Sequence, residues 1–204
     1  MTEPIHRVLV IFAHPSAGKS RVNAPLVRAA RSLEHVTVHD LYEAYPDFDI
    51  DVPREQQLLE SHDVVVWQHP LFWYSTPAIF KEWQDLVLTH GWAYGSEGTA
   101  LRGKHFFNAI TTGGHSGAYT VDGYNRFTVR QLLTPVEQTA FLCGMEYFPP
   151  FVVHGTHALG HAEIKQHAAD YQRTLTAIRD GKIDWEAART CTRLNEDLDA
   201  ILRN

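Results

Sequence analysis

Cysteine is scarce in this chain, since Cys143 and Cys191 are its only two. Two cysteines cannot build a disulfide framework or a four-cysteine zinc site. Long hydrophobic runs are also missing. The run VLVIF at residues 8–12 is far shorter than the ~20 residues of a membrane-spanning helix, and no small-residue cleavage site follows it. We therefore expect a cytoplasmic protein with no signal peptide and no membrane anchor of its own.

An excess of positive charge is missing as well. The chain carries 18 Lys and Arg against 24 Asp and Glu, which gives a net charge of −6. Because nucleic-acid binding proteins present a basic footprint, we expect no nucleic-acid partner. Hydrophobic residues make up 44% and charged residues 21% of the 204 residues. This composition is typical of a globular protein, and the length fits one domain over residues 1–204.

Apolar runs alternate with helical patterns along the whole chain. The runs are continuous and rich in branched residues, as in strands buried on both faces of a parallel sheet. We predict strands at 8–12, 36–38, 63–67 and 106–111, and a fifth within 145–154. We predict helices at 23–33, 54–61, 76–88, 134–143, 162–179 and 185–202. This order predicts an α/β fold, a three-layer sandwich with a five-stranded parallel sheet, followed by an additional C-terminal helix at about 184–204.

Several element boundaries follow from local signals. Thr76 before Pro77 suits an N-cap, and Thr134 with Glu137 suits a capping box. Gly144 and Gly181 suit helix ends. The pair Pro149-Pro150 places the fifth strand at an edge of the sheet.

The loop after the first predicted strand resembles a phosphate-binding loop. Gly18-Lys19-Ser20 matches the end of that motif, while Ala13 stands where its first glycine belongs. Pro15 removes an amide, and no acidic residue follows the strand that ends at Trp67, which weakens a nucleoside-triphosphatase reading. A single phosphate at a helix start and a solvated turn remain as alternatives.

The loop after the third strand is aromatic. Trp67, Phe72, Trp73 and Tyr74 fall within eight residues. Such side chains line the pockets of planar cofactors, but they also cover cores and oligomer interfaces.

The loop after the fourth strand reads Thr111-Thr112-Gly113-Gly114 and continues to Tyr119. Paired glycines allow a close approach of the backbone, and successive amides can donate to a reduced ring and so tune its potential. A plain turn is the alternative. Residues 114–118 nearly spell the nucleophile elbow of a hydrolase, but the polar segment 119–126 follows them instead of a helix.

Thirteen histidines raise the question of a metal site. His157 and His161 are four residues apart and His154 is near, but Gly155, Thr156 and Gly160 make this segment loop-like, and no HExxH pattern is present. We predict no metal site.

Taken together, these loops resemble those of the flavodoxin-like NAD(P)H:quinone oxidoreductases, and most of all the ancillary proteins of glutathione-regulated potassium-efflux systems. The resemblance covers about residues 5–175, and the final predicted helix lies beyond it. The matching segments are VIFAHP (10–15), LYEAYPDFDID (41–51), VVWQHPLFWYSTPAIFKEW (65–83), THGWAYG (89–95), GTALRGK (98–104), TTGG (111–114) and CGMEYFPPF (143–151).

The resemblance implies a flavodoxin-like fold, FMN rather than FAD at the edge of the sheet, and a homodimer with sites near its interface. Residues expected by position to hold the FMN phosphate and ribityl chain are His14, Ser20, Arg21, Val22 and Asn23. Residues expected to flank the ring system are Leu71, Phe72, Trp73 and Tyr74, and those expected to donate to its polar edge are Thr111, Thr112, Gly113 and Gly114. The implied catalytic positions are Tyr119, which matches a family tyrosine, and Asn125, which stands where relatives carry a histidine.

The implied activity is two-electron reduction of a quinone by NADH or NADPH, in two half-reactions at one flavin. Two other functions stay open. The protein could be a regulatory subunit without catalysis, docked on the cytosolic face of a potassium-efflux antiporter and so peripheral to the cell membrane. It could also be a flavin-dependent azo or nitro reductase that uses the same site.

Overall fold

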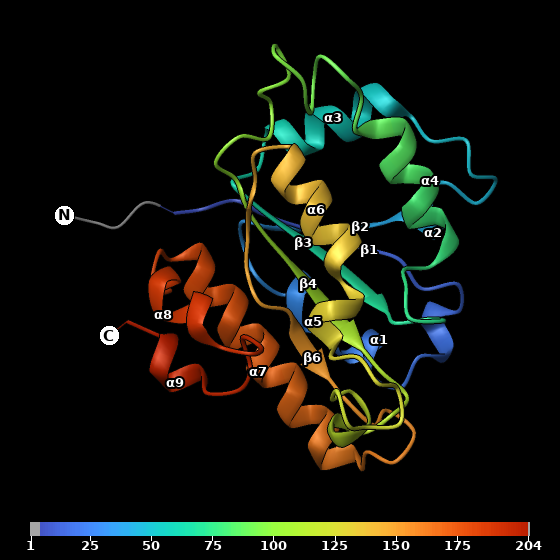
Figure 1. Cartoon of the computed structure of the whole chain (residues 1–204), viewed down its shortest axis with the longest axis vertical. Helices are drawn as coiled ribbons and strands as arrows, with labels where there is room; N and C mark the ends of the chain where they lie inside the picture. Colours follow the sequence, from blue (N-terminus) through green and yellow to red (C-terminus); the bar gives the residue numbers. More distant parts are fainter. Residues whose placement is uncertain (1–4, 204) are drawn as a thin grey trace.

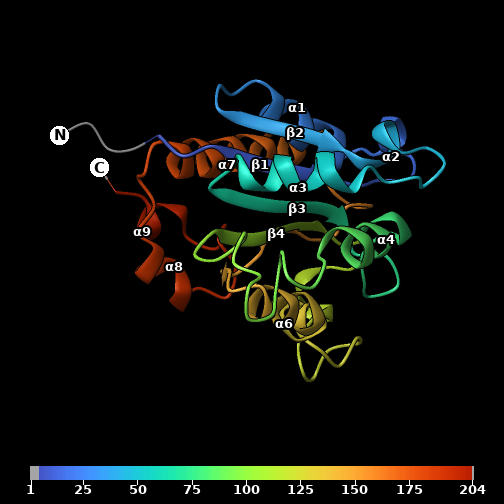
Figure 2. The ribbon, with the colours of Figure 1, turned by 90° about the horizontal axis from the view of Figure 1, so that it is seen from above.

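The computed structural model describes residues 5–203. Its centre is a parallel sheet in the order β2-β1-β3-β4-β5, with β6 also paired to β4 (Figure 1). Figure 2 follows that order from β2 through β1 and β3 to β4. The strands are β1 (Val8–Phe12), β2 (Val36–Asp40), β3 (Val64–Pro70), β4 (His105–Thr111), β5 (Glu146–Tyr147) and β6 (Phe151–Val153). The predicted α/β class and the five-stranded parallel sheet are confirmed, with the fifth strand divided in two.

Helices cover both faces of the sheet, so β1 and β3 are buried along their whole length. One core lies between the sheet and α2 (Leu41–Ala44), α3 (Val52–Glu60), α4 (Ala78–Val87), α5 (Val129–Leu132) and α6 (Thr134–Leu142). The other lies between the sheet and α1 (Asn23–Arg31), α7 (His161–Arg179) and the C-terminal segment. Trp67 and Trp83 fill the first core and Tyr171 fills the second.

The third strand is longer than the sequence predicts. It pairs with β4 through Gln68↔Ala109, His69↔Ile110 and Pro70↔Thr111, three residues beyond the expected end at Trp67. The strand continues through Gln68 and His69, although their side chains are polar, because their main chains still pair with β4. The fifth strand lies at the sheet edge as predicted, and it divides into β5 and β6 on either side of Pro149-Pro150.

Two predicted helix starts are wrong. The residue that caps α4 is Pro77 and not Thr76, and in the described chain α4 has no side-chain cap. Thr134 does not form a capping box either, since its hydroxyl donates to the carbonyl of Gln131 at 2.8 Å. The side chain of Glu137 pairs instead with Arg130, seven residues earlier in α5.

The capping box lies at the start of α5. Thr128 Oγ1 accepts from the Gln131 amide at 3.2 Å, and Gln131 Oε1 accepts from the Thr128 amide at 2.8 Å. The predicted helix ends are confirmed, because Gly144 and Gly181 have φ values of 70° and 69°, which favour glycine.

The single C-terminal helix predicted over 185–202 is also wrong. The segment forms two short helices, α8 (Trp185–Thr190) and α9 (Leu198–Ile201). Asp184 caps the first and Asp197 caps the second, so a new helix start interrupts the pattern. Over residues 5–203, no helix combines the length and the apolar character needed to span a membrane.

Candidate functional site

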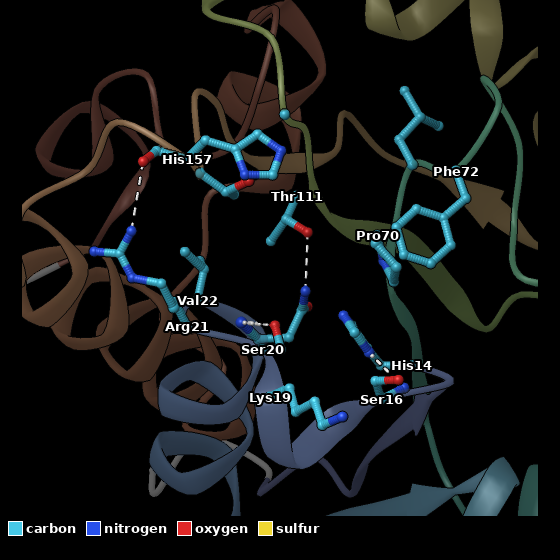
Figure 3. A pocket seen from close by; sticks show the side chains of 14 residues that line it. His14, Ser16, Lys19, Ser20, Arg21, Val22, Pro70, Phe72, Thr111 and His157 are labelled. Atoms are coloured by element: carbon cyan, nitrogen blue, oxygen red, sulfur yellow. Dashed lines mark hydrogen bonds between the residues drawn. The ribbon is translucent and has the colours of Figure 1, made fainter.

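A cavity of about 300 Å³ opens where β1, β3 and β4 end (Figure 3). It therefore lies at the carboxyl edge of the sheet, where parallel α/β sheets bind ligands. Its walls come from the loops after all three strands and from the loop after β6. The lining residues are His14, Ser16, Lys19, Ser20, Arg21, Val22, Asn23, Pro70, Leu71, Phe72, Thr111, Gly113, Thr156 and His157.

One end of the cavity is built around the start of α1. Ala17–Lys19 form a 3-10 turn, and Ser20 Oγ accepts from the Asn23 amide at 3.1 Å. The motif Gly18-Lys19-Ser20 therefore forms a short turn ahead of the helix. Helix N-termini favour anions, and the positive charges of Lys19 and Arg21 add to that field.

Asn23 lines this end of the cavity and has an unused acceptor. Its side chain is only 2% exposed, and Nδ2 donates to Thr111 Oγ1 at 2.9 Å. Its Oδ1 is buried and finds no donor among the described residues. Because a buried acceptor without a donor is costly, this atom suits a ligand that brings a hydroxyl or N–H group.

Arg21 ties the last wall of the cavity to α1. Its guanidinium donates to the carbonyl of Leu159 at 2.9 Å and to that of His157 at 3.4 Å. Thr156 is fixed from the other side, since its amide donates to the Thr112 carbonyl at 3.0 Å. These contacts hold the loop after β6 against the mouth of the cavity.

The aromatic turn after β3 has an unusual backbone. Trp73 and Tyr74 have φ values of 48° and 63°, and the Ser75 amide closes the turn on the Phe72 carbonyl at 2.9 Å. Bulky residues rarely adopt the left-handed region, so this turn stores strain. Phe72 lines the cavity and meets the His14 ring edge-on at 5.8 Å. Trp73 is 93% exposed.

The two glycines after β4 are packed too closely against neighbouring side chains to carry a Cβ without a shift. A Cβ on Gly113 would lie 3.0 Å from His157 Nε2, and one on Gly114 would lie 3.2 Å from Tyr119 Cε2. Gly113 lines the cavity, so its backbone is bare there, as a close approach to a ligand requires.

Tyr119 and His154 lie next to each other beyond the glycines, with ring centroids 5.6 Å apart. Burial raises the pKa of Tyr119. Thr112 Oγ1 donates its single proton to the Gly114 carbonyl at 2.8 Å, so His154 Nδ1, 3.0 Å away, must donate to it. Burial, with the positive charge of Arg193 as a smaller cause, lowers the pKa of His154 to about 4, so this imidazole is neutral.

Asn125 reaches the site indirectly. Its Oδ1 accepts from the hydroxyl of Tyr74 at 3.1 Å, which joins the loop after β4 to the aromatic turn after β3. Its main-chain amide donates to the carbonyl of Ala118 at 2.9 Å. This arrangement makes Asn125 a residue that positions Tyr74.

The structure brings most of the predicted cofactor residues to one cavity. Those that line it are His14, Ser20, Arg21, Val22, Asn23, Leu71, Phe72, Thr111 and Gly113. Those outside the lining are Trp73, Tyr74, Thr112 and Gly114. The sequence analysis missed Ser16, Lys19, Pro70, Thr156 and His157 as lining residues.

Two other sequence features contribute no site chemistry here. Within residues 5–203 no group of three or more His, Cys, Asp or Glu side chains could hold a metal ion. Burial raises the pKa of Cys143 to about 11, so its thiol is not activated.

Comparison with known proteins agrees with this geometry. The family model described as flavodoxin-like fold matches residues 6–175. A glutathione-regulated potassium-efflux system ancillary protein, KefG, of Serratia proteamaculans is 47% identical over 171 residues, which cover 84% of this chain and 93% of the relative.

Two solved structures are similar as well. General stress protein 14 from Treponema denticola, in complex with FMN, has a TM-score of 0.80 at 41% identity, over 84% of this chain and 99% of that one. An NADPH-quinone reductase from P. pentosaceus has a TM-score of 0.75 at 32% identity, over 82% and 96%. From its sequence, its sheet and the position of its cavity, this chain belongs to the flavodoxin-like family.

Proposed function

We propose that this protein is an FMN-dependent NAD(P)H:quinone oxidoreductase. The observation that carries the proposal is a single cavity with a cationic end at the start of α1 and an aromatic and glycine-lined end between β3 and β4. FMN has the same division, with an anionic phosphate at one end and a planar ring system at the other. When bound, FMN supplies two-electron hydride chemistry that no side chain of this protein can provide.

The cationic end would hold the phosphate and the ribityl chain. Main-chain amides at the start of α1, with Ser20 and Arg21, suit the phosphate, while His14 and Val22 complete the wall. Asn23 Oδ1 suits a ribityl hydroxyl because it is buried without a donor among residues 5–203. This unused acceptor is an observation of the site that supports FMN directly.

The other end would hold the ring system. Leu71 and Phe72 form the apolar wall, and Trp73 and Tyr74 extend it outward as the exposed part of the turn. The predicted donors to the polar edge of the ring are Thr111, Thr112, Gly113 and Gly114, but the Thr112 amide already donates to the Val153 carbonyl at 2.9 Å and Thr111 lies within the β4 ladder. The main-chain amides of Gly113 and Gly114 would therefore donate to this edge. Such donors favour extra electron density on the ring and so tune its reduction potential.

Tyr119 is the proposed catalytic residue. Because burial raises its pKa, its hydroxyl stays protonated at neutral pH and can donate to the substrate or the reduced ring. Asn125 would act through its bond to Tyr74, holding the aromatic turn closed beside the nicotinamide or the quinone. The two substrates would bind in turn on the same face of the ring, in two half-reactions.

The decisive test is an absorbance spectrum of the purified protein, followed by anaerobic addition of NADH or NADPH. We expect flavin bands that bleach on addition and return when a quinone is added. We also expect Asn23→Ala to bind FMN about tenfold more weakly, because one hydrogen bond to the ligand is lost. A colourless protein that does not take up added FMN would contradict the proposal.

We also propose a homodimer that covers the exposed apolar side chains beside the site. Tyr124 is 90% exposed, Val121 63% and Phe127 53%, and all three lie on the loop after β4, which Asn125 joins to the aromatic turn through Tyr74. Clusters of exposed apolar side chains mark interaction surfaces. Analytical ultracentrifugation would give twice the chain mass, and Tyr124→Asp with Phe127→Asp would give the monomer.

A second candidate role is regulation of a potassium-efflux antiporter. It is supported by the name of the KefG relative, an ancillary protein of such a system. In this role the protein would be cytoplasmic and would reach the inner face of the membrane only through its partner. Antiporter-dependent recovery in the membrane fraction, with Tyr119→Phe binding as well as the wild type, would separate regulation from catalysis. If the protein reduced azo or nitro compounds faster than it reduces any quinone, the third candidate function, a flavin-dependent azo or nitro reductase, would be favoured.

A further inference from the structure

The C-terminal segment builds part of a second pocket, behind Tyr119. The family model ends at residue 175, and the segment 184–203 lies beyond it. A cavity of about 250 Å³ lies between this segment and the loop after β4. Among its lining residues are Tyr119, Arg130, Val152, His154, Arg193 and Glu196.

The position of Arg193 is fixed by its neighbours. Leu194 is fully buried, and its amide donates to the carbonyl of Pro150 at 2.9 Å. Asn195 then bonds both main-chain groups of Val152, in β6. Arg193 is therefore held against the outer edge of the sheet by residues on its C-terminal side.

The Arg193 guanidinium has no acidic side chain as an ion-pair partner among the described residues. Its Nε is buried without an acceptor within residues 5–203. Arg130 across the pocket is already bonded to Glu137 through two nitrogens. The acid that faces the pocket, Glu196, accepts from the Thr192 amide at 3.2 Å.

The surroundings of the pocket favour an anion with an apolar body. The positive charge of Arg193 lies close enough to His154 to be, after burial, a cause of its lowered pKa. The floor includes Pro150 and Val152, so an organic group is preferred over a bare inorganic ion. A guanidinium fork matches the two oxygens of a carboxylate.

We propose that this pocket binds a small organic carboxylate, with the Arg193 guanidinium as its charged partner and Tyr119 in its wall. The ligand chemistry follows from the unpaired guanidinium, the apolar floor and the hydroxyls of Thr128 and Thr192 around it. The pocket exists only because the C-terminal segment is docked on β6.

The test uses benzoate as the probe on the purified full chain, with binding measured by calorimetry and by thermal shift. We expect benzoate to bind and to raise the Tm, while the neutral isostere benzamide and inorganic phosphate do neither. Arg193→Gln should weaken benzoate binding at least about tenfold, because a charge-assisted hydrogen bond is lost. Arg102→Gln, which removes an exposed arginine away from the pocket, is the matched control.

Arg193→Met provides a second variant that keeps the apolar stem if the glutamine variant is unstable. Equal binding of benzoate by the wild type and both Arg193 variants would overturn the proposal, and so would equal binding of benzamide. An absence of any benzoate binding to the wild type would overturn it too.

One consequence rests on the proposed function. Because Tyr119, the proposed catalytic residue, lines this second pocket, saturating benzoate should change the rate of quinone reduction in the wild type and leave it unchanged in Arg193→Gln. The two failures are distinguishable, since calorimetry and thermal shift report the carboxylate pocket even if the protein reduces no quinone.

Discussion

Asn195 bonds the main chain of Val152 as a neighbouring strand would. The Val152 amide donates to Asn195 Oδ1 at 2.9 Å, and Asn195 Nδ2 donates to the Val152 carbonyl at 2.9 Å. One side chain thus satisfies the outward-facing groups of an edge strand, which would otherwise be open to another chain. This contact connects the C-terminal segment to the sheet and, through β6, to the functional site.

Removing that contact should weaken the whole fold. We expect Asn195→Ala to lower the free energy of unfolding by about 1–3 kcal/mol, because two partly buried main-chain groups lose their partners. Urea denaturation followed by circular dichroism measures this value. Asn195→Asp keeps an acceptor for the Val152 amide but places a negatively charged oxygen against the Val152 carbonyl, so it should lose stability as well. Wild-type stability in both variants would contradict the interpretation.

The glycine pair should be intolerant of a single methyl group at its first position. In Gly113→Ala the new Cβ would lie 3.0 Å from His157 Nε2, so the side chain or the loop must move, at a cost of about 1–3 kcal/mol. We expect weaker flavin binding, measured by fluorescence titration. In the double variant with His157→Ala the clash is absent, and binding should recover in part. Gly18→Ala is the control, since a Cβ there meets no described atom within 4 Å.

The aromatic turn should be more stable without its first strained side chain. Trp73 is 93% exposed with φ of 48°, so Trp73→Gly removes little packing and relieves a backbone conformation that costs about 1 kcal/mol. We expect a higher free energy of unfolding in chemical denaturation. Trp73→Ala keeps the strain and loses the same ring, and it should show no such gain. An equal gain of unfolding free energy in both variants would show that the effect comes from loss of the indole ring and not from relief of backbone strain.

Acid should destabilise the fold through His69. This side chain is fully buried in β3, where its Nε2 and the Asn108 amide nitrogen lie 3.2 Å apart, and burial lowers its pKa to about 4. Between its ordinary pKa of 6.5 and that value, the unfolded chain binds a proton that the folded chain does not. Stability is therefore complete above about pH 6.5 and falls as the pH drops toward 4, by about 1.4 kcal/mol per pH unit for this one group.

The variant His69→Gln keeps a hydrogen-bonding side chain and has no proton to gain. We expect a shallower decline of unfolding free energy between pH 6.5 and 4, measured by urea titrations at each pH. His161→Gln, at an exposed position, should leave the decline unchanged. An unchanged slope in His69→Gln would exclude this histidine as the cause.

The strands and the cavity loops could be predicted because their signals are local. Runs such as VLVIF and DVVVW have no stable place except a sheet covered on both faces. Because parallel strands end at one edge, the loops at 13–20, 67–77 and 111–119 had to meet. The resemblance supplied the residue roles that spacing alone could not.

The errors arose where tertiary contacts compete with a local motif. Thr134 and Glu137 have the spacing of a capping box. However, Arg130 forms an ion pair with Glu137, and the Thr134 hydroxyl donates a hydrogen bond to the carbonyl of Gln131. The apolar pattern over residues 185–202 predicts one helix, because nothing in the sequence indicates that the Asn195 side chain bonds the main chain of β6. His154 and His157 entered the sequence analysis only as metal candidates, since nothing local links them to the loop after β4.

The hydrogen bond from Arg21 to the carbonyl of His157 spans 136 positions of the chain. Contacts between such distant residues form only after the intervening elements have docked, because closing so long a loop has a large entropy cost. The early half of the chain can bring the loops after β1 and β3 together, but the cavity lacks its last wall until β6 has joined β4. Ligand binding at this cavity therefore reports on the completion of folding, and a chain interrupted before residue 157 would keep much of the sheet and lose the site.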